Sequence, residues 1–160
     1  DPVIVLEHEA IYNLKGEVAD KEHFAPLEGA RVVHEGTDVT LVGYLMSTHW
    51  NLAAADKLAE QGISAEVIDL RALKPIDHET VRASLAKTHK AVIVTEDEAP
   101  VGMSAEIMAV INEECFFELD APPVRVTAED VPMPYNHKLE RAALPDTDRI
   151  VQATQKMLGQ

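Results

Sequence analysis

The sequence predicts a three-layer α/β/α fold, in which a sheet lies between two layers of helices. Two short runs of apolar, β-branched residues, Val67–Leu70 and Ala91–Thr95, are typical of strands covered on both faces of a parallel sheet. A capped, amphipathic stretch separates these runs, and similar stretches alternate with apolar runs along the chain. A parallel βαβ unit has a right-handed connection and places ligands or partners at the carboxyl ends of its strands.

The N-terminal residues predict a strand, a linker and the first strands of the sheet. Val3–Leu6 is apolar and is expected to be a strand, whereas Asn13–Leu27 is polar and is expected to be a linker. Arg31–Glu35 and Val39–Leu45 flank a turn. They are expected to be either an edge pair or a lead-in followed by the first core strand.

Capping residues mark where the helices are expected to begin. The expected caps of four successive helices are Ser47 or Thr48, Asp77, Ser104 and Asp146. The apolar stripes that pack on the sheet are expected at Trp50, Ala54 and Leu58, at Val81 and Leu85, at Ile107, Val110 and Ile111, and at Ile150, Ala153, Thr154 and Met157. A further short strand is expected at Val124–Thr127.

Four segments carry a resemblance to a known family. IDLRALKPID at residues 68–77, followed by VTEDEAP at 94–100, closely resembles the C-terminal domain of the β subunit of thiamine-diphosphate-dependent 2-oxoacid dehydrogenases. The pyruvate dehydrogenase type fits best. FFELDAPPVRVTAEDVPMPY at 116–135 resembles the same subunit, and PVIVLEHEAIYNLKGEV at 2–18 resembles the end of its preceding, pyrimidine-binding domain.

The resemblance covers almost the whole chain and implies two parts. Residues 1–27 are expected to be the tail of the pyrimidine-binding domain and a linker, and residues 28–160 a transketolase C-terminal-like domain. The resemblance also implies a five-stranded, mostly parallel sheet with one antiparallel strand. Because the chain starts at Asp1 inside what resembles the last strand of another domain, a fragment of a longer subunit is expected.

The charge and the single cysteine restrict the partners and the environment. A formal net charge of −14 disfavours nucleic acid and anionic membranes, which would repel such a surface, and favours a basic protein partner. No apolar run is long enough to span a bilayer. Cys115 has no internal disulfide partner, which fits a bacterial cytoplasm or a mitochondrial matrix, and it is expected to be a buried apolar residue.

The sequence contains none of the common catalytic or phosphate-binding motifs. Its seven glycines form neither a G-x-G-x-x-G loop nor a P-loop, and no H-E-x-x-H, C-x-x-C or G-x-S-x-G occurs. In the family that the chain resembles, thiamine diphosphate and Mg²⁺ lie between a domain of the α subunit and the N-terminal domain of the β subunit. The complete enzyme is expected to use both, while this chain alone is expected to hold no catalytic, cofactor or metal residue.

Polar residues gather at the predicted carboxyl edge of the sheet. His49, Arg71 and Glu98 follow three successive core strands. One interpretation makes His49 an acid/base or ligand-orienting group with Asp69 or Glu98 nearby. The favoured interpretation makes the three residues an interdomain edge, with Arg71 paired to a local acidic group.

The loop VGMS, residues 101–104, is shorter and has fewer glycines than is common in the family. It predicts an abrupt start of the third helix at Met103 or Ser104, with free N–H groups available to an anion. A water molecule or a glutamate side chain is the alternative occupant.

The resemblance also implies docking. In the family, this domain pairs with a second β subunit, in an assembly with α subunits, and holds the small basic binding domain of the lipoyl acyltransferase. Asp120 matches an acidic position of that binding surface, and the terminal carboxylate at Gln160 takes a comparable place. For Asp120, an ordinary turn residue is the alternative. The PMPY segment is expected to present Met133 and Tyr135 at a subunit interface, with a plain surface loop as the alternative.

Two classes of function follow. The favoured one is a non-catalytic, subunit-pairing and acyltransferase-docking part of a pyruvate or other 2-oxoacid dehydrogenase β subunit. The alternative is an independent α/β domain that binds a small ligand, or the same domain from acetoin dehydrogenase, transketolase or deoxyxylulose-phosphate synthase. The missing catalytic motifs favour the first class.

Overall fold

The computed structural model describes residues 2–18, 20–22, 24 and 26–159. Its centre is a five-stranded sheet in the order β1-β3-β2-β4-β5. The strands are β1 (Arg31–His34), β2 (Val39–Gly43), β3 (Ala65–Asp69), β4 (Ala91–Glu98) and β5 (Val124–Ala128). β1 runs antiparallel to β3 and the other pairs are parallel, which confirms the predicted mostly parallel sheet.

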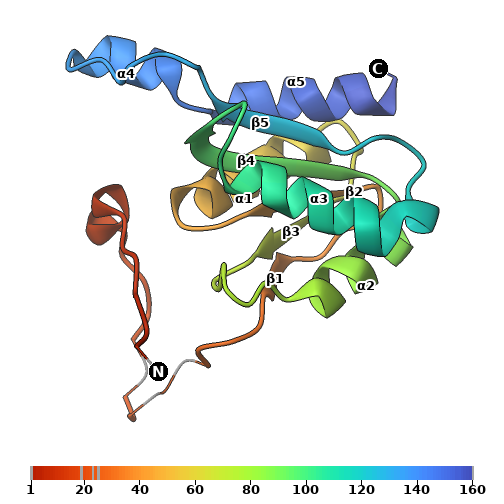
Figure 1. Ribbon diagram of the computed structural model, residues 1–160, viewed down its shortest axis with the longest axis horizontal. Helices are drawn as coiled ribbons and strands as arrows, with labels where there is room; N and C mark the ends of the chain where they lie inside the picture. The colour runs from red at the N-terminus through yellow and green to blue at the C-terminus, as the bar shows by residue number, and fades with distance from the viewer. Residues whose placement is uncertain (1, 19, 23, 25, 160) are drawn as a thin grey trace.

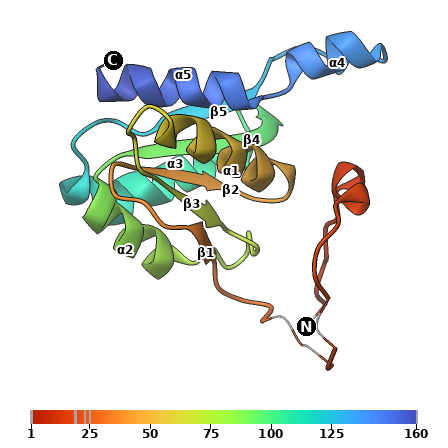
Figure 2. The ribbon, with the colours of Figure 1, turned by 180° about the vertical axis from the view of Figure 1, so that it is seen from behind.

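Helices cover both faces of this sheet (Figures 1 and 2). α1 (Met46–Ala59) and α5 (Thr147–Leu158) pack on one face, and α2 (His78–Thr88) and α3 (Met103–Cys115) pack on the other. The shorter elements are η1 (Glu9–Asn13), η2 (Phe116–Glu118) and α4 (His137–Ala143). The predicted three-layer α/β/α architecture is confirmed.

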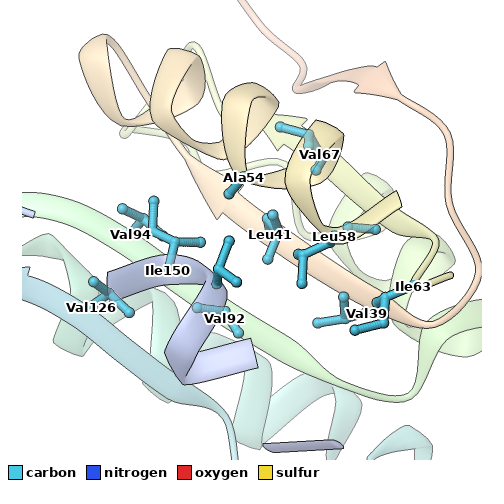
Figure 3. Close-up of a cluster of buried hydrophobic side chains, with 13 residues drawn as sticks. Val39, Leu41, Ala54, Leu58, Ile63, Val67, Val92, Val94, Val126 and Ile150 are labelled. Atoms are coloured by element: carbon cyan, nitrogen blue, oxygen red, sulfur yellow. The ribbon is translucent and has the colours of Figure 1, made fainter. Parts of the chain in front are cut away.

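The core consists of two apolar clusters, one on each face of the sheet. Alternate residues of a strand point to opposite faces, so Leu41 contributes to the cluster under α1 and α5, whereas Val42 contributes to the other. Figure 3 shows Leu41, Leu58 and Ile150 meeting in the first cluster, and all three are fully buried. Burying a side chain of this size contributes about 1.5–3 kcal/mol, so these contacts fix the helices on the sheet.

A buried hydroxyl network joins β2 to α2. The Thr40 hydroxyl lies 2.6 Å from the hydroxyl oxygens of both Ser84 and Thr88, and the Thr88 hydroxyl also donates to the backbone oxygen of Ser84. All three side chains are buried. Because every hydroxyl has a partner, the polar groups can be buried without the cost of an unpaired donor or acceptor.

A buried ion pair fixes the same, C-terminal end of α2. The Glu66 side chain, on β3, is 1% exposed and accepts hydrogen bonds from the Lys87 ammonium group and the backbone N–H of Gly36. Burial by itself would raise the pKa of Glu66, but hydrogen bonds from Lys87, Ser84 and Gly36 outweigh it, so the pKa is lowered from 4.5. The ionised carboxylate therefore stabilises the fold.

Two of the four predicted helix caps are confirmed. The Asp77 carboxylate accepts from the backbone N–H of Thr80 at 3.0 Å, and that of Asp146 accepts from the N–H of Arg149 at 2.8 Å. The caps predicted at Ser47 or Thr48 and at Ser104 are wrong, since α1 starts after Leu45 and α3 after Gly102 without a side-chain cap from these residues.

The chain passes from β2 to α1 through only two residues, which explains the missing serine cap. Leu45 has φ 51°, and Ser47 lies inside the first turn, where its hydroxyl donates to the backbone oxygen of Tyr44 at 2.7 Å. A Cβ atom on Gly43 would lie 2.8 Å from both the Ser47 hydroxyl and the Asn51 amide. Glycine at the end of β2 therefore allows α1 to approach the strand closely.

Three further expectations are corrected or decided by the structure. Val3–Leu6 is not a strand: its residues are exposed and pair with no strand among the described residues, so apolar composition alone did not suffice. Arg31–Glu35 leads into the first core strand and does not form an edge pair with Val39–Leu45, because β1 pairs with β3 and not with β2. α4 was not expected; it is capped by Asn136, whose side chain accepts from the N–H groups of Lys138 and Leu139.

We expect Glu66→Gln to lower the free energy of unfolding by about 2 kcal/mol at neutral pH, because a charge-assisted hydrogen bond is lost in a buried site. A carboxylate whose pKa is lower in the folded than in the unfolded state stabilises the fold at pH values above its unfolded pKa. This stabilisation is lost as the pH falls through the folded pKa. The wild type should therefore lose stability below about pH 4.5, and the variant should lose less. Urea unfolding across this range measures both effects.

Glu113→Gln is the matched control, since Glu113 is exposed and makes no ion pair within the described residues. It should leave the stability nearly unchanged. Equal pH dependence of the wild type and Glu66→Gln would show that the buried pair does not contribute to acid unfolding.

Candidate functional site

The carboxyl edge of the sheet is the first place to look for a site. The chain leaves β2 for β3 on one side and later returns to β4 on the other, so the strand order reverses between β2 and β4. Open α/β sheets bind ligands at such a point. Tyr44 follows β2 there, and Glu96 and Asp97 lie at the end of β4.

Asp97 is engaged by the chain's own backbone. Its carboxylate accepts from the Thr95 hydroxyl and from the backbone N–H of Met103, the first residue of α3. A Cβ atom on Gly102, which has φ 92°, would lie 2.4 Å from the Asp97 carboxyl carbon. At the N-terminus of α3, an anion was expected, with a water molecule or a glutamate as the alternative; one N–H there is instead bonded to an aspartate of β4.

Tyr44 faces the same acidic residues. Burial, and then the negative charges of Asp97 and Glu96, raise the pKa of Tyr44 to about 12. The phenol therefore stays protonated at neutral pH and can donate a hydrogen bond. It is unsuited to act as a general base there, since a base must give up its proton near the working pH.

Two side chains of the carboxyl edge hold the N-terminal segment. His8 Nε2 lies 3.0 Å from the Glu96 carboxylate, while His8 Nδ1 accepts from the N–H of Ala10 at 3.1 Å. The Arg71 guanidinium donates to the backbone oxygen of Pro26 at 2.5 Å, and not to a local acidic group as expected. Residues 2–18 accordingly lie beside this edge, to which the arrow of β4 points in Figure 1.

His49 and Glu98 are placed at the same edge but are not paired. His49 is exposed in the first turn of α1, and Glu98 is exposed at the end of β4. Within the described part of the chain, neither makes a side-chain hydrogen bond or an ion pair. An acid/base role for His49 gains no support from this geometry, and the interdomain role of both residues stays a prediction.

Asp120 lies shortly before β5, at the edge where the parallel strands begin, which we call the amino edge. Its carboxylate lies 3.5 Å from the Lys90 ammonium nitrogen, and its backbone N–H donates to the oxygen of His89 at 2.9 Å. A hollow of about 310 Å³ beside it is lined by Thr37, Asp38, Gly62, Ile63, Thr88, His89, Lys90 and Leu158. Since Leu158 ends α5, the fold brings Asp120 and the end of α5 to one edge. Gln160 lies outside the described residues.

Met133 and Tyr135 lie toward the opposite edge. They follow the carboxyl end of β5 and precede α4, and their exposed fractions are 48% and 105%. The residues expected to bind partners are therefore divided between the two ends of the sheet. Figure 1 shows α4 projecting beyond the carboxyl end, on the same side as residues 2–18.

The start of α3 is not free to hold a diphosphate. A diphosphate needs free backbone N–H groups such as those of a helix N-terminus, but Asp97 already accepts from that of α3 and adds a negative charge. Among the described residues, no three His, Cys, Asp or Glu side chains gather as ligands of a metal ion. In the same part of the chain, no helix has the length and apolarity required to cross a membrane.

The structural roles of Tyr44, His8 and Asp97 were not predicted from the sequence. The position of Tyr44, directly after the first core strand, was the available signal. The His8–Glu96 contact joins residues 88 positions apart, and no local pattern indicates it. Cys115 was correctly predicted to be buried, and this burial raises the pKa of its thiol.

Comparisons with known proteins give a consistent answer. A family model described as transketolase, C-terminal domain, matches residues 28–150. The pyruvate dehydrogenase E1 component subunit beta of Cyanidium caldarium is 45% identical over 98% of this chain and 48% of its own length. The 2-oxoisovalerate dehydrogenase subunit beta of Bacillus subtilis is 38% identical over 98% of this chain and 49% of its own length. The chain spans about half the length of these curated relatives.

A solved structure shares the fold. It is described as a split gene transketolase, inactive beta4 tetramer, and it matches 90% of this chain and 46% of its own chain with a TM-score of 0.74 and 30% identity. The sheet order, the matched range and the sequence identities agree with the motifs at residues 68–77 and 94–100. The chain therefore belongs to the transketolase C-terminal domain family, and pyruvate dehydrogenase E1 β subunits are among its relatives.

Proposed function

We propose that this chain is the non-catalytic, subunit-pairing and partner-docking part of the β subunit of a 2-oxoacid dehydrogenase, with pyruvate as the substrate of the complete assembly. The observation that carries the proposal is that the carboxyl edge, where an α/β domain meets a ligand, is bound by the chain's own residues. Such an edge serves to join parts of a protein. Thiamine diphosphate and Mg²⁺ would then be held by other parts of the assembly.

The surface beyond the carboxyl edge supports subunit pairing. Met133, Tyr135 and Leu139 are exposed on one projecting segment. Large apolar and aromatic side chains in such a position are typical of the buried centre of an interface. A second β subunit and an α subunit are the proposed partners of this surface.

The amino edge supports docking of a basic partner. Asp120 is 65% exposed, and the chain as a whole has a net charge of −14. A surface of this sign attracts a basic domain over a distance comparable to the Debye length and orients it before contact. The basic subunit-binding domain of a lipoyl acyltransferase is the proposed partner here, and a bacterial cytoplasm or mitochondrial matrix is the proposed compartment.

We expect the 160-residue chain to show no stoichiometric binding of thiamine diphosphate with Mg²⁺ and no oxidative decarboxylation, because Asp97 already occupies the first N–H of α3 and no metal ligands gather among the described residues. Isothermal calorimetry measures the binding. The complete assembly is the positive control. Micromolar, stoichiometric binding by the chain alone would contradict the non-catalytic role and favour an independent ligand-binding domain.

We expect Asp120→Asn in the complete assembly to weaken binding of the acyltransferase domain by about fivefold at low salt, which corresponds to about 1 kcal/mol. The loss should shrink at high salt, because screening removes the contribution of an exposed charge in the wild type as well. Asp130→Asn makes the same charge change on an exposed residue after β5 and is the matched control. Equal affinities of all three proteins at low salt would leave Asp120 as an ordinary turn residue.

A further inference from the structure

The amino edge carries an exposed aromatic pair that the proposed function does not use. Phe116 and Phe117, in η2, are 63% and 97% exposed. Their ring centroids are 5.4 Å apart and the rings meet edge to face at 86°. An exposed pair of large aromatic side chains is uncommon on a surface in contact only with water, and marks a site of interaction.

The pair is mounted on a fixed part of the fold. Cys115, the residue before it, is buried in the core, and His89 Nδ1 lies 2.7 Å from the backbone oxygen of Glu118. The N–H of Asp120 then donates to the oxygen of His89. Because both ends of η2 are held, binding at the two rings would cost little conformational entropy.

Acidic residues adjoin the aromatic pair in the sequence. Between residues 112 and 123 the chain has no lysine or arginine, while it carries the carboxylates of Glu113, Glu114, Glu118 and Asp120. Two of these make contacts with cationic or titratable groups of neighbouring elements, namely Glu114 with His78 at 3.4 Å and Asp120 with Lys90 at 3.5 Å. Arg82 of α2 is another cationic side chain near η2, since it lines a hollow together with Glu118. The rim of the aromatic pair is therefore predominantly negative.

A hollow lies next to the pair. It has a volume of about 240 Å³ and is lined by Glu79, Arg82, Ala83, Ala86 and Glu118. Glu118, which directly follows Phe117 in η2, lines the hollow, so the hollow borders η2. The small side chains of Ala83 and Ala86 leave room for an apolar side chain of a partner.

We propose that Phe116 and Phe117, together with this hollow, form the apolar centre of a docking surface for a basic protein segment that carries an exposed apolar side chain. The aromatic rings and the alanines contact the apolar side chain, and the surrounding carboxylates pair with its basic neighbours. Asp120 lies at the border of the same surface. The inference rests on the proposed docking function and names its apolar anchor.

The charge of the surface favours this occupant over a second copy of the chain. In a twofold interface the same patch meets itself, so the four carboxylates of residues 113–120 would face four others. Like charges brought together in this way oppose association. A basic segment neutralises them.

Calorimetric titration of the complete assembly with the basic acyltransferase domain tests the proposal at about 0.05 and 0.5 M salt. Phe117→Ala should raise the dissociation constant about tenfold at both concentrations, because apolar contact is not screened. Asp120→Asn should act mainly at low salt. Val101→Ala, which trims an apolar side chain 70% exposed at the opposite end of the sheet, should bind as the wild type does. Unchanged thermal unfolding of Phe117→Ala shows that the variant is folded.

The outcomes separate this inference from the function on which it rests. If Asp120→Asn weakens binding while Phe117→Ala binds like the wild type, docking stands and the aromatic anchor is refuted. If the wild type does not bind at low salt, the docking function and the anchor both fail. If Phe117→Ala changes the sedimentation of the assembly and not its affinity, the rings belong to a contact between copies, which overturns the inference.

Discussion

The structure of the carboxyl edge of the sheet depends on the contacts of the Asp97 carboxylate. This carboxylate accepts from the first backbone N–H of α3, lies against Gly102, and adds its charge to that of Glu96 beside the Tyr44 phenol. One side chain near the end of β4 thereby bonds the start of α3, at the edge where the strand order reverses. With this N–H already bonded and a negative charge in place, the start of α3 is less suited to a further anion. The carboxyl edge is thus occupied in part by contacts of the chain with itself.

The two edges of the sheet thus differ in chemistry. The carboxyl edge is occupied by contacts of the chain with itself, through Glu96 and Arg71. The amino edge exposes Asp120 and the aromatic residues of η2, and Leu158 at the end of α5 lines the hollow beside Lys90. A sheet whose strands are parallel separates the two chemistries by construction, because all its strand-to-helix turns lie at one end and all its helix-to-strand turns at the other.

Contacts between residues close together in the sequence could be predicted, whereas contacts between residues far apart in the sequence could not. The caps at Asp77 and Asp146 were predicted because each contact spans three residues. The cap at Ser104 was not, since the competing acceptor, Asp97, comes from the preceding strand and wins through the geometry of Gly102. The antiparallel course of β1 was implied by the family resemblance, not by periodicity, because its partner β3 is more than 30 residues away. For the same reason the placement of Asp120 and the end of α5 at one edge required the fold.

The two contacts of the N-terminal segment have a consequence for how it is released. The His8 imidazole contacts the Glu96 carboxylate and the Pro26 backbone oxygen accepts from Arg71, so the chain before β1 is attached to the same domain at two points. When one contact opens, the other keeps the segment near its site and maintains a high effective concentration for rebinding. The penalty for closing the chain between two such points grows only slowly with its length, so the second contact forms at little cost once the first is made. Each contact therefore favours re-formation of the other.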